Sequence, residues 1–487
     1  MSEISKQELK SKSINGFFWR FSERLASHLV MSVVTIVLAR LLMPDDFGVV
    51  ALAMVFVNVA NVFIISGLNT SLIQKKDVDD IDYSTIFYAT VLLSLILYIV
   101  IFVSSPLIAE IYDNDKVNSL LRVLGIFIPL STFNSIQQAM VSRNLDFKKI
   151  FVATLCGTLI AGCIGIGLAL AGFGAWALVG QQLSNIVFNT ITLSFIIRWK
   201  PRLVFSINRF KSLFGFGTNL MFANFIGSIF NQLRNFLVGL KYTPSDLAYF
   251  TTGDMFPVLI SNNVDVAINS VLFPAMSKIQ DNLEEVKRAM RRSMMTSSYL
   301  LVPSLLMLAA VADKLVIILL TEKWMFCVPY IQVLSIGYCF STLGTANLQA
   351  INAIGRSDVT LKLEFFKKTI FIIIIIVSSQ ISPLMIAVGS AFYNLIATLI
   401  NLYPNRKLIN YGIGSQIKDV IPQFLLSITV ALLVFVLGRL PIPNILCLML
   451  QLIVGVGVYL SVSYWLSLES YLYIRQIVKE FREKRNC

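Results

Sequence analysis

Long apolar runs of roughly twenty residues recur along the whole chain and are separated by short polar segments. An α-helix needs about 20 predominantly apolar residues to cross the hydrocarbon core of a bilayer. The pattern therefore predicts an all-α polytopic membrane protein with about fourteen transmembrane helices. Their approximate bounds are residues 14–42, 46–73, 83–105, 117–141, 150–171, 174–197, 211–239, 246–273, 290–312, 327–352, 359–379, 382–403, 417–438 and 444–466.

The first predicted helix carries charged side chains along one face. Arg20, Arg24 and His28 recur at intervals of four residues, and Glu23 lies on the edge of the same face. A charge at the centre of a bilayer costs about 2.5–3.5 kcal/mol on insertion scales. We therefore expect this face to point toward other helices or a water-filled cavity rather than toward lipid.

Three further helices of the series carry polar side chains at helical spacing. These are Asn58 and Asn61 in 46–73, Asn224, Asn231 and Arg234 in 211–239, and Asp254 and Asp265 in 246–273. For an isolated asparagine, hydrogen bonding between helices is favoured over a cavity. For the arginines a cavity is favoured, because a guanidinium without a partner is costly in lipid.

The composition supports a membrane protein and excludes a soluble domain. Of 487 residues, 56% are hydrophobic and only 14% are charged, whereas soluble domains carry about a quarter charged residues. Under alternating topology, 32 of the 40 Lys and Arg residues fall on the side of the two termini, seven fall on the other side, and Arg234 alone lies in mid-membrane. The positive-inside rule then places both termini in the cytoplasm. The net charge of +13 follows from this topology and indicates no nucleic-acid partner.

The most charged connection on the cytoplasmic side is SKIQDNLEEVKRAMRRSM, residues 277–294. We expect it to form an amphipathic helix on the inner membrane surface.

The sequence also repeats weakly at an offset of 200 residues. LARLLMPDDFGVV (38–50) aligns with VGLKYTPSDLAYF (238–250), so that Pro44 matches Pro244 and Asp46 matches Asp246. Both segments follow a charged helix that starts on the cytoplasmic side, which predicts two six-helix halves of the same orientation. The expected organisation is an N-terminal lobe (1–200), a C-terminal lobe (201–410), and two extra helices with a basic cytoplasmic tail (411–487).

Several segments carry a family resemblance, most clearly in the first half. They are LARLLMPDDFG (38–48), GLNTSLIQKKDVDDIDYSTIF (67–87), PLIAEIYDN (106–114) and SRNLDFKKI (142–150). With the helix count, they resemble the polysaccharide-transporter branch, or Wzx-type flippases, of the multidrug/oligosaccharidyl-lipid/polysaccharide exporter superfamily. The resemblance implies two pseudo-symmetric six-helix bundles in a V around a central cavity, with two further C-terminal helices.

The resemblance also implies a transporter, not an enzyme. Such proteins move an undecaprenyl-diphosphate-linked oligosaccharide from the inner to the outer leaflet of the bacterial cytoplasmic membrane by alternating access. Membrane lipids, the carrier-linked glycan and a glycan polymerase or biosynthesis complex would be the partners. The alternatives left open are a drug/cation antiporter of the same superfamily, a membrane glycan polymerase or ligase, and a lipid-binding scaffold protein.

Cationic residues on the first and seventh helices resemble those that line the cavity of related flippases. On that ground the diphosphate ligands would be Arg24 and Arg234, with Arg20 as a third, because arginine offers two parallel donors to phosphate oxygens. The polar residues Glu23, His28, Asn58, Asn61, Asn224, Asn231, Asp254 and Asp265 would line the cavity, and the ionisable ones could couple transport to H⁺ or Na⁺. A single histidine and the lack of any CxxC indicate no metal site, and no cofactor is expected.

Overall fold

The computed structural model describes residues 6–75 and 77–486, and every regular element in that part of the chain is a helix. By its packing the chain divides into two compact units, Met1–Ala248 (unit 1) and Tyr249–Cys487 (unit 2). These units reflect helix packing, and the expected lobe boundaries at residues 200 and 410 stay predictions about the sequence repeat.

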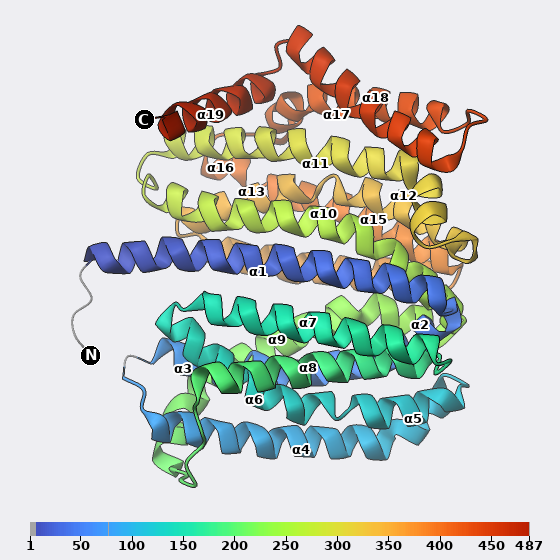
Figure 1. The fold of residues 1–487 in the computed structure, drawn as a ribbon. Coiled ribbons are helices and arrows are strands. Elements are labelled where there is room, and N and C mark those ends of the chain that lie inside the picture. The colour runs from blue at the N-terminus through green and yellow to red at the C-terminus, as the bar shows by residue number, and fades with distance from the viewer. Residues whose placement is uncertain (1–5, 76, 487) are drawn as a thin grey trace. The chain divides into compact units, whose positions relative to one another are not determined.

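In its described residues, unit 1 contains nine helices and the first residues of a tenth (Figure 1). The long helices α1, α4, α7 and α8 lie nearly parallel or antiparallel to one another, as expected of helices that cross a bilayer. The bounds are α1 Lys6–Leu41, α2 Pro44–Ile65, α3 Leu68–Gln74, α4 Asp80–Ile111, α5 Asp115–Leu124, α6 Phe127–Asn144, α7 Phe147–Leu170, α8 Ala175–Ile197 and α9 Ile207–Lys241.

Unit 2 takes up the chain within α10 and ends with three helices that pack on α11. The bounds are α10 Pro244–Ser277, α11 Leu283–Leu319, the 3₁₀ helix η1 Glu322–Cys327, α12 Val328–Tyr338, α13 Ser341–Ala353, α14 Ser357–Ser378, α15 Pro383–Leu402, α16 Asn405–Leu408, α17 Ile413–Leu437, α18 Asn444–Trp465 and α19 Glu469–Asn486.

The prediction of a helical, membrane-spanning chain is confirmed. Within the described residues, ten helical segments are long and apolar enough to cross a membrane, and the count of fourteen stays a prediction. Three of the predicted spans are each divided into two helices, namely α2 and α3, α5 and α6, and α12 and α13. The hydropathy pattern does not detect such breaks, because the residues at the break remain apolar or small.

Most of the charged segment 277–294 is helical, as expected, and belongs to α11. Residues from Leu283 onward form one continuous helix that runs to Leu319. Asn282 caps its first turn by accepting a hydrogen bond from the amide of Glu285 at 3.3 Å. The segment therefore opens a long helix and does not form one of its own, and its place on the membrane surface stays a prediction.

The two segments that the sequence repeat aligns have the same local structure. Pro44 and Pro244 are the first residues of α2 and α10. The carboxylate of Asp46 accepts a hydrogen bond from the amide of Met43 at 3.2 Å, and that of Asp246 accepts one from the amide of Thr243 at 3.1 Å. An aspartate in the first turn also complements the positive end of the helix dipole. The aligned residues therefore perform the same capping role in both helices.

Polar side chains of α6 connect it to three neighbouring helices of unit 1. Since lipid offers no hydrogen bonds, buried polar groups in a membrane bundle must find partners on other helices. The pairs are Ser131 to Asn61 of α2 (2.6 Å), Asn69 of α3 to Ser135 (2.6 Å), Asn134 to Asn189 of α8 (3.0 Å) and Gln137 to Ser194 of α8 (2.7 Å).

The connection between α8 and α9 is fastened to the start of α4. The amides of Arg202 and Ser206 donate to the hydroxyls of Ser84 (3.0 Å) and Thr85 (3.2 Å). Arg209 forms ion pairs with Asp79 and Asp82. The Arg209 guanidinium, helped by the backbone amide of Asp82, lowers the pKa of Asp79 to about 2.

Candidate functional site

The polar face predicted on the first helix is present on α1 and lies partly uncovered. Arg24 and His28 are exposed, and the exposed Leu25 and Leu29 lie beside them. Another side of α1 packs on α7, where a β-carbon on Gly162 would come within 2.5 Å of the Val34 side chain. Arg24 and His28 are therefore not used for packing α1 onto α7.

Two of the predicted residues on α1 neutralise each other. The Arg20 guanidinium lies 3.0 Å from the carboxylate of Glu23, which is buried. Arg20 also lies over the ring of Phe147, at 6.0 Å from its centre. Arg24, one turn further on, forms no ion pair or hydrogen bond with any described residue. Of the two arginines, Arg24 has its charge available for an anion.

The predicted polar residues of α9 lie apart from its packing face. Phe225 and Phe236 pack against α2 through Phe63 (4.5 Å between ring centres) and Phe56 (6.3 Å). On other sides of the helix, Asn224 and Asn231 are exposed and Arg234 is half-buried. Asn58 of α2 is half-buried, and Asn61 accepts the Ser131 hydrogen bond described above. Asn61 therefore stabilises the bundle, whereas Asn224 and Asn231 remain open to a ligand.

In unit 2 the polar side chains of α10 form a ladder with α13. Ser261 bonds to Ser341 at 2.9 Å, Thr345 donates to Asp265 at 3.0 Å, and Gln349 donates to Asn269 at 2.7 Å. Each pair is separated by 80 residues, and successive pairs lie four residues apart, so the two helices run parallel and in register. Tyr338, the last residue of α12, donates a hydrogen bond to Asp254 of α10 at 3.1 Å. These aspartates join helices within unit 2.

Sequence reasoning found one side of this ladder and missed the other. Ser341, Thr345 and Gln349 recur at intervals of four, as the α10 residues do. They were not predicted as a polar face, because their segment contains no charged residue. The same signal, a recurrence of Ser and Asn at helical spacing, would have identified Ser131 and Ser135 on α6.

Two neighbouring lysines stand at the middle of the 22-residue helix α14 (Ser357–Ser378). Lys367 is buried and pairs with Glu364 one turn earlier, and Lys368 is half-buried. Both are among the 32 basic residues assigned to the side of the two termini, and that assignment stays a prediction.

The described part of the chain holds no group of three or more His, Cys, Asp or Glu residues that would suit a metal ion. What it offers instead are cationic and amide side chains on exposed helix faces. Guanidinium and amide groups of this kind bind phosphate oxygens and sugar hydroxyls through hydrogen bonds.

Comparison with known sequences places residues 37–329 in the family described as polysaccharide biosynthesis protein. The lipopolysaccharide biosynthesis protein WzxC of Escherichia coli (strain K12) is 23% identical over 86% of this chain and 85% of its own length. The succinoglycan biosynthesis transport protein ExoT of Rhizobium meliloti (strain 1021) is 24% identical over 70% of this chain and 69% of its own length.

Two solved structures share the fold. The lipid II flippase MurJ in its inward closed conformation has a TM-score of 0.74 at 15% identity, with 96% of this chain and all of MurJ covered. A multidrug resistance MATE family transporter of the MOP superfamily, in its inward-facing conformation, has a TM-score of 0.60 at 15% identity, with 79% of this chain and 94% of its own covered. The expected fold class is confirmed by both.

Proposed function

Because the chain belongs to the polysaccharide biosynthesis protein family, we propose that it is a flippase for a lipid-linked oligosaccharide. The cargo would be an oligosaccharide repeat unit on an undecaprenyl diphosphate carrier, moved from the inner to the outer leaflet of the cytoplasmic membrane. The chain is a multi-pass membrane protein, and its relatives that are described by activity are transport proteins rather than enzymes. The MurJ fold is compatible with a cargo of this kind.

The observation that carries the proposal is the exposed guanidinium of Arg24, which pairs with none of the described residues and stands within a helix apolar enough to cross the membrane. The span Ser22–Leu41 begins two residues before it. A charge held there without a partner is unfavourable unless an anion or water meets it, and a diphosphate is such an anion. Arg234, half-buried on α9, would be the second ligand, and Arg20 a weaker third because Glu23 already neutralises it.

The proposed mechanism is alternating access between two six-helix lobes around a central cavity. The diphosphate would bind from the inner leaflet, and the lobes would then rock to release it to the outer leaflet. Asn224 and Asn231 would meet sugar hydroxyls. Both termini would lie in the cytoplasm, as the distribution of Lys and Arg predicts.

For ion coupling we favour Asp265 over Glu23. Glu23 is buried against Arg20, so a proton or Na⁺ would compete with a guanidinium. Asp265 accepts hydrogen bonds from the neutral hydroxyls of Thr345 (3.0 Å) and Ser261 (3.5 Å), whose oxygens can equally face a cation. H⁺ and Na⁺ both remain candidates.

The test is an export measurement in a strain from which the corresponding gene has been deleted. We expect lipid-linked oligosaccharide to accumulate on the inner leaflet and surface glycan to disappear, and both changes to be reversed by the full chain. The alternative, a drug/cation antiporter of the MATE type, predicts normal surface glycan in the deletion strain and increased sensitivity to cationic drugs.

A further inference from the structure

Two neighbouring arginines of α11 have opposite surroundings. Arg291 is held between two carboxylates, with its Nε 2.9 Å from Asp419 of α17 and a terminal nitrogen 2.7 Å from Glu469 of α19. Arg292 forms no ion pair with any described residue, and its guanidinium lies 5.5 Å from the centre of the Tyr473 ring. The two arginines and two carboxylates together are neutral, and of the two guanidinium groups that of Arg292 is the one that no described carboxylate holds.

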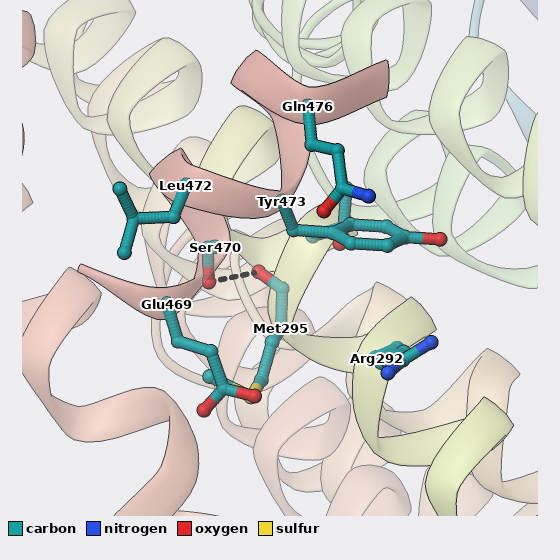
Figure 2. A pocket seen from close by; sticks show the side chains of 8 residues that line it. Arg292, Met295, Glu469, Ser470, Leu472, Tyr473 and Gln476 are labelled. Carbon is teal, nitrogen blue, oxygen red and sulfur yellow. Dashed lines mark hydrogen bonds between the residues drawn. The ribbon is translucent and has the colours of Figure 1, made fainter. Parts of the chain in front are cut away.

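Arg292 stands at the edge of a small polar pocket between α11 and α19 (Figure 2). The pocket measures about 220 Å³, and Tyr473 and Gln476 of α19 extend over it while Arg292 approaches from α11. Glu469 also lines the pocket, but both of its oxygens accept hydrogen bonds from Arg291 at 2.7 Å. The pocket therefore brings the Arg292 cation together with the neutral polar side chains of Tyr473 and Gln476.

An apolar groove of about 420 Å³ shares Arg292, Thr296 and Tyr473 with the polar pocket. It runs between two antiparallel helices and takes its lining from successive turns of each. These residues are Val264, Ile268, Leu272 and Ala275 from α10, and Ala289, Ser293, Ser297 and Leu300 from α11. The apolar lining of the groove, which could bind a hydrocarbon chain, is therefore continuous with the positively charged side chain of Arg292.

The length of the groove matches one leaflet of a bilayer. From Val264 to Ala275, and from Ala289 to Leu300, the helices advance eleven residues, which at 1.5 Å per residue is about 16 Å. Half of a hydrocarbon core about 30 Å thick is about 15 Å. Arg292 lies one turn in from the Ala289 end of the groove, where the charged start of α11 gives way to its apolar part, and a side chain of this length can extend its charge toward the lipid headgroups.

From this combination we infer that the groove and the pocket form a binding site for an anionic glycerophospholipid of the bilayer. One acyl chain lies between α10 and α11, and the phosphate meets Arg292 and Gln476. Basic pockets between transmembrane helices are known to receive anionic headgroups. The much longer chain of a polyprenyl carrier exceeds a groove of one leaflet, and this inference stands independently of the proposed flippase activity.

The experiment measures thermal unfolding of the purified full-length chain in neutral detergent, titrated with dioleoyl phosphatidylglycerol or dioleoyl phosphatidylcholine. We expect phosphatidylglycerol to raise the unfolding temperature of the wild type at lower concentrations than phosphatidylcholine does. Arg292→Gln should raise the half-effective concentration of phosphatidylglycerol about fivefold, the loss expected for one surface cation. Arg406→Gln, which removes an exposed arginine elsewhere in unit 2, should leave it unchanged.

A second variant changes the apolar groove and leaves the charge of Arg292 in place. Ala275 is exposed and lines the groove, so Ala275→Phe should fill part of it and weaken both lipids while the unfolding temperature without lipid stays near that of the wild type. Equal potency of the two lipids on the wild type, or an undiminished phosphatidylglycerol response in both variants, would overturn the inference. So would an equal effect of inorganic phosphate, or a response to a polyprenyl diphosphate that Arg292→Gln weakens more than it weakens the phosphatidylglycerol response.

Discussion

The carbonyl oxygen of Pro244 lies against Gly48 so closely that a β-carbon on Gly48 would stand 1.8 Å from it. Both residues belong to unit 1, and each lies in the first turn or two of a helix that the sequence repeat aligns. The first turns of α2 and α10 therefore meet at one point, where only glycine leaves room for the backbone.

The first prediction concerns this contact. Gly48→Ala should destabilise the protein by about 1–3 kcal/mol, because the obstructing atom belongs to the backbone and cannot move aside as a side chain can. Thermal unfolding in detergent measures the effect. Gly167→Ala in α7 is the matched control, since nothing lies within 4 Å of its β-carbon position. This control should gain up to about 1 kcal/mol from helix propensity. A stable Gly48→Ala variant would show that the two helix ends are further apart.

The second prediction concerns the ladder between α10 and α13. In a double-mutant cycle, Ser261→Ala and Ser341→Ala should be coupled by about 0.6 kcal/mol, the average for interhelical hydrogen bonds in membrane proteins. Ser261→Ala combined with Gln349→Leu is the control, because these residues stand on different rungs. Coupling of zero in the first cycle, or equal coupling in both, would contradict the ladder.

The third prediction concerns the mid-helix ion pair of α14. Glu364→Gln should destabilise the protein by about 1–3 kcal/mol, because it leaves the buried Lys367 ammonium without its carboxylate. Adding Lys367→Met should recover most of this loss in the double variant. Lys362→Met, at an exposed position of the same helix, should have little effect. If Lys362→Met costs as much as Glu364→Gln, the stability of α14 does not depend on the ion pair.

The fourth prediction concerns the acid sensitivity of the anchor between α4 and α9. The pKa of Asp79 is lowered from 3.8 to about 2, so its contribution to stability is fully present above pH about 4. As the pH falls from about 4 toward 2, the unfolded chain takes up the proton first and the contribution is lost. Asp79→Asn keeps a good helix cap but removes the charge. The difference in unfolding temperature between wild type and this variant should therefore shrink on acidification, and a constant difference would exclude the ion pair.

The sequence predicted the membrane-spanning helical fold, the two aligned helix starts and the family. These features depend on hydropathy, on local capping residues and on short motifs. Each of these signals is local in the sequence and can be recognised within a few consecutive residues. The partners of the polar side chains were not predictable in this way. Whether Asn61 meets Ser131 or Asp265 meets Thr345 depends on which helices become neighbours, and hydropathy carries no information on that.

The candidate site shows the same division. The charged face of α1 followed from helical spacing, and Arg24 is indeed exposed there. The pairing of Arg20 with Glu23 was visible as a three-residue spacing, but the sequence could not decide whether the pair would form or whether both would face a ligand. The burial of Lys367 was likewise not predictable, because it depends on which helices surround α14.

The most direct test of the flippase proposal is surface-glycan export by arginine variants expressed in the deletion strain. Arg24→Ala and Arg234→Ala should abolish export while the amount of protein in the membrane stays at the wild-type level. Arg24→Lys should retain part of the activity, because a point charge replaces a two-pronged donor. Leu25→Ala, an exposed neighbour on α1, should export normally. Full export by the Arg24→Ala/Arg234→Ala double variant would contradict the role of these arginines in binding the diphosphate.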